Sequence, residues 1–235
     1  MKYLIADLVV EMTPKHANLK NLAAPFEYNR SRTADLVLNV SEQSLRTISS
    51  QFQENVSVEQ IENLAYSKQF CRAAIPYQVM LVHSSALIYD GGAYLFSGDS
   101  GVGKSTHTQL WLQAFGEKVH IMNDDKPVVR IYDDHVLACG TPFDGGSGIA
   151  LNETYPLKAI IFIERGEQNS VRRPDSREVL QKLYFQTAHT VNAEDADKML
   201  QNFERLLAIT PFYILSCNMD ISAVHTAFDA IIKNC

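Results

Sequence analysis

The segment that decides the fold of this 235-residue chain reads Gly98-Asp99-Ser100-Gly101-Val102-Gly103-Lys104-Ser105. It matches the pattern GxxxxGK[ST] at every fixed position. With this composition, about three matches per thousand sequences of this length are expected by chance. An apolar run, Ala93–Phe96, precedes the segment, and Leu110, Trp111 and Ala114 follow it at helical spacing. The pattern predicts a strand, a phosphate-binding loop and a helix, whereas the simpler alternative is a Gly-rich turn before a helix.

Each residue type in the loop has a chemical role. Glycines let the backbone turn so that successive N–H groups point at an anion, and the start of a helix adds partial positive charge. In this pattern Lys104 reaches the β- and γ-phosphates, and Ser105 offers a hydroxyl to Mg²⁺. The predicted nucleotide-binding residues are Gly98, Asp99, Ser100, Gly101, Val102, Gly103, Lys104, Ser105 and Thr106.

Two acidic residues, Asp124 and Asp125, end an apolar run that starts at Val119, about twenty residues after the loop lysine. This spacing suits a strand that neighbours the one feeding the loop and whose end brings a carboxylate to the metal. Adjacent aspartates also begin turns, and Asp133-Asp134 is predicted to be a hairpin turn.

His83 precedes the loop by one predicted hairpin. Asp90-Gly91-Gly92 lies between the apolar runs Ala86–Tyr89 and Ala93–Ser97, which is a strong hairpin signal. A single strand histidine is more often structural. The hairpin nevertheless joins its strand to the one that feeds the loop, so we expect His83 to lie beside the metal and the γ-phosphate.

These residues resemble the HPr kinase/phosphorylase family and its relatives, the ATP-dependent phosphoenolpyruvate carboxykinases. The similar segments are HSSALIYDGGAYLFSGDSGVGKST and NDDKPVVR. The resemblance covers about residues 80–145 and, more loosely, 146–217. It implies an α/β fold with a P-loop core of the HPr kinase and carboxykinase type, preceded by a small N-terminal α+β portion. The expected division is residues 1–77 and residues 78–235.

The resemblance also implies an activity: an ATP- and Mg²⁺-dependent kinase that transfers the γ-phosphoryl group to a hydroxyl, with a serine of a protein or peptide as the expected acceptor. The implied catalytic residues are His83, Lys104, Asp124 and Asp125, and the implied metal ligands are Ser105, Asp124 and Asp125. One aspartate would bind Mg²⁺ and the other would take the hydroxyl proton, with the assignment open. Alternatives are a small-molecule kinase, acting for instance on free serine, and a nucleotide-binding regulatory module with little turnover.

Some features extend or depart from this resemblance. HPr kinases carry an acidic residue where this chain has Thr106, and the sequence gives no clear counterpart of their phosphorolysis signature, so phosphorolysis is not expected. The segment Gly140–Gly148 is similar to one in small HPr-kinase-like proteins, some of which act on peptide precursors. It is predicted either to hold an acceptor, to close over phosphate, or to be a plain surface loop. One of Arg165, Arg172 and Arg173 could stabilise transition-state charge, although three arginines on a polar connection are more often simply solvated.

Composition excludes several classes of protein. Lys and Arg total 21 against 27 Asp and Glu, a net charge of −6, so nucleic-acid binding is not expected. No apolar run approaches 18 residues and no signal peptide is recognised, so we expect a cytoplasmic chain without membrane contact. The widely spaced cysteines Cys71, Cys139, Cys217 and Cys235 predict reduced thiols. Because relatives of HPr kinase often form oligomers, a homo-oligomer is compatible with the resemblance.

Hydrophobic periodicity predicts the remaining elements. A capping box at Ser57 and Gln60 starts one helix, and three amphipathic helices lie after residue 175, the last with Asp220 as its N-cap. The predicted strands are Lys2–Val10, Ala34–Val40, Val79–His83, Lys158–Ile163 and Phe212–Cys217.

Overall fold

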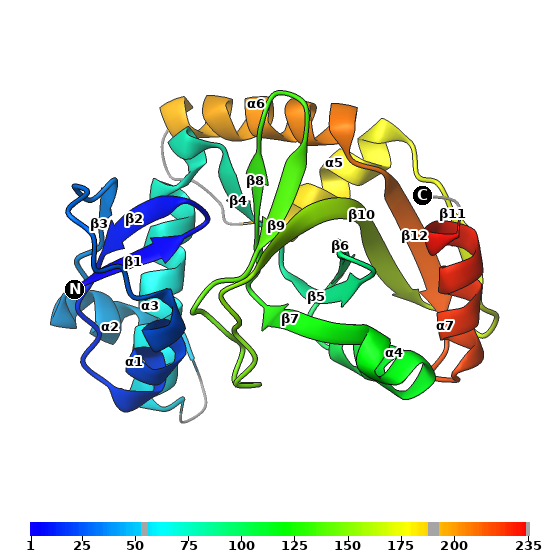
Figure 1. The fold of residues 1–235 in the computed structure, drawn as a ribbon, viewed down its shortest axis with the longest axis horizontal. Coiled ribbons are helices and arrows are strands. Elements are labelled where there is room, and N and C mark those ends of the chain that lie inside the picture. The colour runs from blue at the N-terminus through cyan, green and yellow to red at the C-terminus, as the bar shows by residue number, and fades with distance from the viewer. Residues whose placement is uncertain (53–55, 188–192, 234–235) are drawn as a thin grey trace.

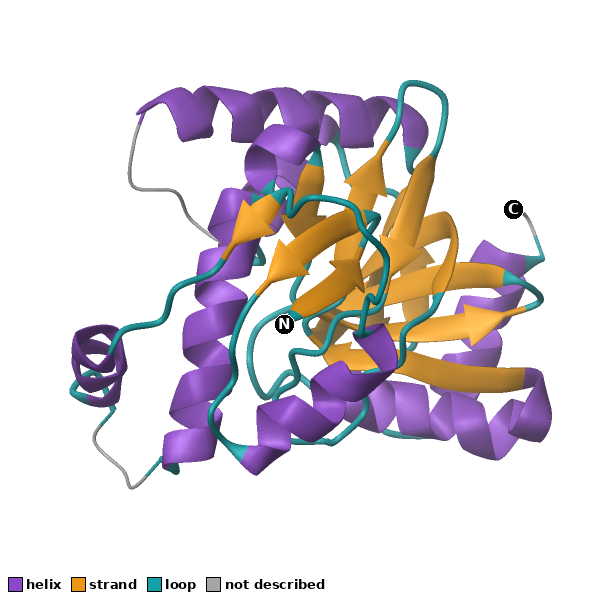
Figure 2. Ribbon diagram, turned by 60° about the vertical axis from the view of Figure 1, so that its left-hand side comes forward, coloured by secondary structure: helices purple, strands orange, loops and turns teal. Residues whose placement is uncertain are grey.

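The computed structural model describes the chain except for residues 53–55, 188–192 and 234–235. The described residues form a curled, mixed sheet of nine strands, a second sheet of three strands, and helices on both faces of the larger sheet (Figures 1 and 2). The fold is therefore mixed α/β, as the sequence predicted.

The α-helices of the described residues are α1 (Ala17–Ala23), α2 (Glu42–Ser49), α3 (Val58–Ala73), α4 (Lys104–Phe115), α5 (Ser176–Phe185), α6 (Ala193–Ile209) and α7 (Ser222–Ala227). The small sheet contains β1 (Lys2–Ile5), β2 (Leu8–Glu11) and β3 (Leu36–Val37). The large sheet contains β4 (Val79–Leu81), β5 (Ser84–Tyr89), β6 (Gly92–Ser97), β7 (Val119–Asp125), β8 (Val128–Ile131), β9 (Val136–Cys139), β10 (Thr154–Arg165), β11 (Ser170–Arg172) and β12 (Phe212–Cys217).

The order of strands brings several strand ends to one edge of the large sheet. The main path runs β4-β8-β9-β10-β6-β5-β7, with β12 also beside β10. Strand β6 is parallel to β10, which is parallel to β12. Strands β6 and β7 are each antiparallel to β5 and so run in the same direction. The carboxyl ends of β6, β7, β10 and β12 and the start of β5 therefore lie at the same edge.

Two sequence predictions about these strands need correction. Strand β7 does not neighbour β6, because β5 lies between them. The connection through α4 passes over β5, and the acidic pair still reaches the edge from which the loop starts. Strand β4 ends at Leu81 and β5 begins at Ser84, so His83 lies in the break between two strands and not within one. This break leaves the His83 side chain outside the strand ladder.

Helices cover both faces of the parallel part of the sheet. Alternate strand residues point to opposite faces, so Leu95 belongs to the hydrophobic cluster that contains Phe203 of α6 on one face, while Phe96 packs with Trp111 of α4 on the other, with ring centroids 5.8 Å apart. Helices α5 and α6 share the first face, and α4 and α7 share the second. Figure 1 shows α6 above the sheet and α4 below β7. This three-layer packing fixes α4, and with it the loop that precedes the helix.

The N-terminal portion differs in detail from its prediction. Lys2–Val10 is not one strand, because Ala6 and Asp7 have positive φ angles of 49° and 60° and turn the chain into the hairpin of β1 and β2. The predicted capping box at Ser57 and Gln60 is confirmed at the start of α3. One hydrophobic cluster joins this portion to the rest of the chain, with the rings of Phe70 and Phe143 5.7 Å apart. The division into residues 1–77 and 78–235 stays a prediction.

Other local predictions are confirmed. Asp90-Gly91, with φ angles of 47° and 69°, turns the hairpin of β5 and β6, and Asp133-Asp134 lies between β8 and β9. Phe212–Cys217 is β12, and Lys158–Ile163 lies within β10. The prediction of Asp220 as the N-cap of the last helix is wrong by one residue, because α7 begins at Ser222 with Ile221 as its N-cap; the Asp220 carboxylate still accepts from the Ser222 N–H at 2.8 Å.

The cysteines that the structure describes are unpaired thiols. Cys71, Cys139 and Cys217 are buried, and burial raises the pKa of Cys71 to about 12. Cys235 lies outside the described residues. None of the helices in the described part of the chain is both long and apolar enough to cross a bilayer.

A buried histidine behind the loop gives the fold a pH dependence. His107 on α4 is 3% exposed and accepts a hydrogen bond from the indole N–H of Trp111 at 3.0 Å, which places its proton on Nδ1. Burial lowers the pKa of His107 to about 4. The unfolded chain therefore binds more protons than the native chain between pH 6.5 and 4, so this contribution to stability is lost as the pH falls.

We expect the free energy of unfolding to fall by about 2 kcal/mol more between pH 7 and pH 5 in the wild-type chain than in His107→Gln, because a glutamine does not titrate. Urea unfolding followed by the fluorescence of Trp111, the single tryptophan, measures the difference. Equal pH dependence in both proteins would contradict a neutral, buried His107.

Candidate functional site

The Gly98–Ser105 loop joins β6 to α4 at the edge where the strand ends meet. Its glycines are required by backbone geometry. Gly101 and Gly103 have φ angles of 75° and 116°, which residues with a Cβ rarely adopt. At Gly98, with φ 149°, a Cβ would also lie 3.1 Å from the carbonyl oxygen of Ile163. The loop can therefore take this course only with glycine at these positions.

Lys104 begins α4 and points back into the loop. It is 9% exposed, and its ammonium donates to the carbonyl oxygens of Gly98 at 2.9 Å and Asp99 at 3.2 Å. Burial lowers its pKa, while the carboxylates of Asp125, Asp124 and Asp99 act in the opposite direction. A positive charge thus lies at the centre of the loop, close to three carboxylates.

Ser105 and Asp124 form the oxygen pair expected for a divalent cation. The Ser105 hydroxyl donates to Asp124 Oδ1 at 3.0 Å. Mg²⁺ takes oxygen ligands, and proteins commonly supply one or two carboxylates while substrate phosphates and waters complete the shell. No group of three or more His, Cys, Asp or Glu side chains in the described ranges is arranged to hold a metal unaided. The donor set fits Mg²⁺ bound together with a phosphate.

Asp125 has a different environment from its neighbour. Its Oδ1 lies 3.0 Å from His83 Nε2, and its Oδ2 accepts from the ammonium of Lys126. Burial raises its pKa, but the hydrogen bond from His83 and the Lys126 charge outweigh burial and hold the pKa well below its usual range. Its φ of 142° is rare for a residue with a Cβ, and such strain persists where surrounding contacts over-determine the residue.

The Gly140–Gly148 segment packs against the end of β7. Asn123, fully buried, donates from its side-chain amide to the carbonyl oxygens of Thr141 and Phe143, both at 3.0 Å. The Lys126 ammonium donates to the carbonyl oxygen of Asp144 at 2.7 Å. A Cβ at Gly145 would lie 2.9 Å from Asp125 Cγ. The segment is therefore a wall of the site, although whether it holds an acceptor stays a prediction.

Replacing Gly145 by alanine is expected to displace the Asp125 carboxylate, because a Cβ at 2.9 Å forces one of the two groups to move. Displacing a group that acts on a substrate by about 1 Å costs up to about 100-fold in rate, so if Asp125 has the catalytic role expected from the sequence, the rate should fall about 10- to 100-fold. Steady-state kinetics with thermal unfolding measures both effects. The control is Ser147→Ala in the same segment, and equal activity of the two variants would show that Gly145 does not position Asp125.

His83 also contacts a residue that the sequence did not single out. Its Nδ1 lies 3.0 Å from Oε1 of Gln186, and its backbone N–H donates to the Gln186 carbonyl oxygen at 2.7 Å. The Gln186 amide donates to Asp99 Oδ1 at 2.9 Å. A glutamine just after an amphipathic helix carries no local signal of this kind, because its partners lie 103 and 87 positions away.

The structure separates the three candidate arginines. Arg165, at the end of β10, donates to the carbonyl oxygen of Gly101 at 2.6 Å and so contacts the loop. Arg172 forms a two-bond ion pair with Glu178, and Arg173 lies over the ring of Tyr213. Arg165 is the one of the three that contacts the loop in this conformation.

Cavities lie on both sides of the loop. One cavity, of about 530 Å³, has Gly98, Asp99 and Gln186 among its lining residues. The other, of about 440 Å³, has Gly103, Thr106 and Asn218 among its lining residues. Ser100 and Thr106 are exposed, whereas Val102 is half-buried. These cavities leave room beside the loop for a ligand larger than phosphate.

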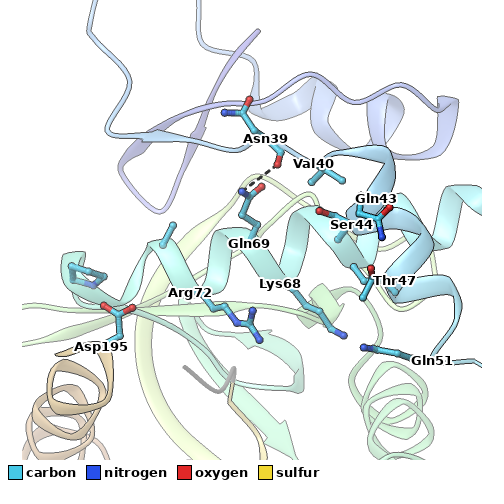
Figure 3. A pocket seen from close by; sticks show the side chains of 14 residues that line it. Asn39, Val40, Gln43, Ser44, Thr47, Gln51, Lys68, Gln69, Arg72 and Asp195 are labelled. Atoms are coloured by element: carbon cyan, nitrogen blue, oxygen red, sulfur yellow. Dashed lines mark hydrogen bonds between the residues drawn. The ribbon is translucent and has the colours of Figure 1, made fainter. Parts of the chain in front are cut away.

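A larger cavity, of about 670 Å³, lies between α2, α3 and the start of α6 (Figure 3). Its lining includes Lys68, Gln69 and Arg72 of α3. None of the residues predicted for the site lines it. Size alone therefore does not locate the residues with phosphate or metal chemistry.

Comparisons with known proteins find little. No protein-family model matches the chain, and a sequence comparison with curated proteins finds no match. Among solved structures, the chain is similar to the Hpr(Ser) kinase/phosphatase from Coxiella burnetii, with 12% identity and a TM-score of 0.39 over 66% of this chain and 94% of that one. This is a distant likeness in fold.

Proposed function

We propose that this protein is an ATP- and Mg²⁺-dependent phosphotransferase that passes the γ-phosphoryl group to a hydroxyl, with a serine of a protein or peptide as the acceptor. The observation that supports this most is the meeting of three groups at one sheet edge. They are the buried Lys104 in its glycine loop, the Ser105–Asp124 oxygen pair, and the Asp125–His83 pair.

The loop and Lys104 would bind the triphosphate. Backbone N–H groups around Gly101 and Gly103, together with the start of α4, offer donors and partial positive charge to phosphate oxygens. To do so, the Lys104 ammonium exchanges its bonds with the loop carbonyls for bonds with β- and γ-phosphate oxygens. The nucleoside would extend into one of the cavities beside the loop.

The two aspartates would have different roles, one in binding the metal and the other in orienting the acceptor hydroxyl. Asp124, with Ser105, would hold Mg²⁺, which neutralises charge on the phosphate oxygens when bound. Asp125 stays ionised because of His83 and Lys126, so it would orient the acceptor hydroxyl by accepting its hydrogen bond. As the hydroxyl oxygen bonds to phosphorus and ADP leaves, the hydroxyl proton passes to Asp125. Position and charge therefore supply the catalysis.

The test offers the purified chain radiolabelled ATP and Mg²⁺ with serine-containing peptides, proteins from the same operon, free serine, and water alone. We expect label on a peptide or protein serine, located by mass spectrometry, and its loss on chelation of Mg²⁺. Label on free serine alone would instead identify a small-molecule kinase. Release of phosphate with every acceptor would identify an NTPase, and nucleotide binding without turnover would favour the regulatory module.

A further inference from the structure

Gln186 lies at the junction of two parts of the site, although no role has been assigned to it so far. It follows the last residue of α5 and is 6% exposed. Its side chain joins Asp99 of the loop to His83, and its carbonyl oxygen also holds the backbone of His83. It thereby contacts both the phosphate-binding loop and the partner of Asp125.

The chemistry of these groups fixes the direction of each hydrogen bond. An ionised carboxylate only accepts, so the Gln186 amide nitrogen must face Asp99 and its oxygen must face His83. The Gln186 amide oxygen and the Asp125 carboxylate also only accept, so both His83 contacts need a ring proton, one on Nδ1 and one on Nε2, which is the doubly protonated form of the ring. This orientation directs the other ring nitrogen, Nε2, at Asp125 Oδ1 at 3.0 Å. The result is a continuous chain of three contacts from Asp99 to Asp125.

We propose that Gln186 is a positioning residue for phosphoryl transfer, which couples the phosphate-binding loop to the His83–Asp125 pair. Fixing the ring through Nδ1 holds Nε2 on Asp125 and so holds the carboxylate that orients the hydroxyl. Because Asp99 belongs to the loop, a change in its position on phosphate binding would reach the same pair through Gln186. This inference rests on the proposed kinase activity and adds to it a coupling between nucleotide and acceptor sites.

Packing alone does not explain this residue. A buried amide costs free energy unless both its ends are bonded, and an apolar side chain could fill the space without that requirement. The helix end does not need the side chain either, because the backbone N–H of Gln186 already bonds the carbonyl oxygens of Lys182 and Leu183. The Gln186 amide can do what an apolar side chain cannot: its nitrogen donates to Asp99, and its oxygen accepts from His83 Nδ1.

The first measurement is the kinetics of Gln186→Leu, which keeps the buried volume and removes both side-chain bonds. We expect kcat to fall about 10- to 100-fold, the size of effect found when the outer-shell partners of metal-ligating residues are lost, with a smaller change in the KM for ATP. Gln201→Leu on α6 is the matched control, because Gln201 is exposed. A Gln186→Leu variant with the kcat of the control would overturn the proposal.

The second measurement exchanges the hydrogen-bond donor and acceptor between positions 186 and 99. Gln186→Glu alone sets a carboxylate against Asp99, and we expect it to lose activity as the leucine variant does. Adding Asp99→Asn lets the introduced amide donate to the introduced carboxylate, whose second oxygen still accepts from His83 Nδ1. We expect the double variant to recover at least about tenfold in kcat over Gln186→Glu. Failure to recover would show that Gln186 acts through packing alone.

A third readout does not depend on turnover. In protein labelled with ¹⁵N-histidine, the Nδ1 proton of His83 should give a protected resonance in the wild type and the double variant, and lose it in Gln186→Leu. Its absence from the wild type would overturn the proposed link. Transfer to no acceptor by the wild type would refute the kinase activity instead, so the two failures are distinguishable.

Discussion

Lys104→Ala is expected to lower ATP-dependent phosphoryl transfer about 10²- to 10³-fold or more, because removal of a single donor to developing charge has effects of this size. The ammonium lies inside the loop, where burial lowers its pKa, and no other described cation reaches the carbonyl oxygens of both Gly98 and Asp99. Radiolabelled ATP at saturating Mg²⁺, with the acceptor that the labelling experiment identifies, measures the rate of transfer.

The fold should survive this change. The Lys104 ammonium donates to carbonyl oxygens of its own loop, and truncation removes a buried charge rather than leaving one unpaired. Thermal unfolding and circular dichroism should therefore match the wild type closely. Lys118→Ala, at an exposed lysine after α4, is the control. Full transfer activity in Lys104→Ala would mean that the loop does not bind the triphosphate.

Asp125→Asn is expected to lower kcat about 10²- to 10⁴-fold, the range found for groups that accept a proton in the transition state. Asparagine keeps the size of the aspartate side chain and, as a residue, adopts positive φ angles more readily than most. It removes the charge that His83 and Lys126 surround. Steady-state kinetics over a range of Mg²⁺ concentrations measures the effect.

Asp124→Asn provides the comparison that separates the two carboxylates. Asp124 is hydrogen-bonded to Ser105, whereas Asp125 is bonded to His83 and Lys126. We therefore expect Asp124→Asn to require more Mg²⁺ for half-maximal activity, and Asp125→Asn to lose kcat without such a shift. The opposite pattern would exchange the roles of the two aspartates. If neither the wild type nor the two variants turned over ATP, and both variants still bound the partner protein as the wild type does, the regulatory module would be favoured.

The acidic pair shows what the sequence could and could not predict. Its place at the end of a strand followed from the apolar run before it, but which aspartate meets which partner did not. Adjacent residues on a strand point to opposite faces. The choice between faces depends on the register of β7 against β5, where Ser84 pairs with Asp125 and Ser85 pairs with Asp124. That register is a long-range property, and it separates the partners of Asp124 from those of Asp125.

The N-terminal hairpin shows a different reason for failure. Lys2–Val10 reads as a single strand because its residues are mostly apolar, yet Ala6 and Asp7 adopt positive φ angles. Aspartate tolerates this region and alanine does so rarely, so the sequence gives little warning of the turn. The hairpin is favoured because β2 then pairs with β1 on one side and β3 on the other.

The sequence by itself determined the features that depend on neighbouring residues: the glycine loop with its lysine and serine, the Asp90-Gly91 turn, the Ser57 capping box, and the acidic end of β7. Each follows from backbone angles, local hydrogen bonds or periodicity. The tertiary structure alone decided that β5 separates β6 from β7, that Gly145 lies against Asp125, and that Gln186 joins Asp99 to His83. Those contacts join residues far apart in the chain, and they form only when packing of the whole core compensates the entropy of closing such long loops.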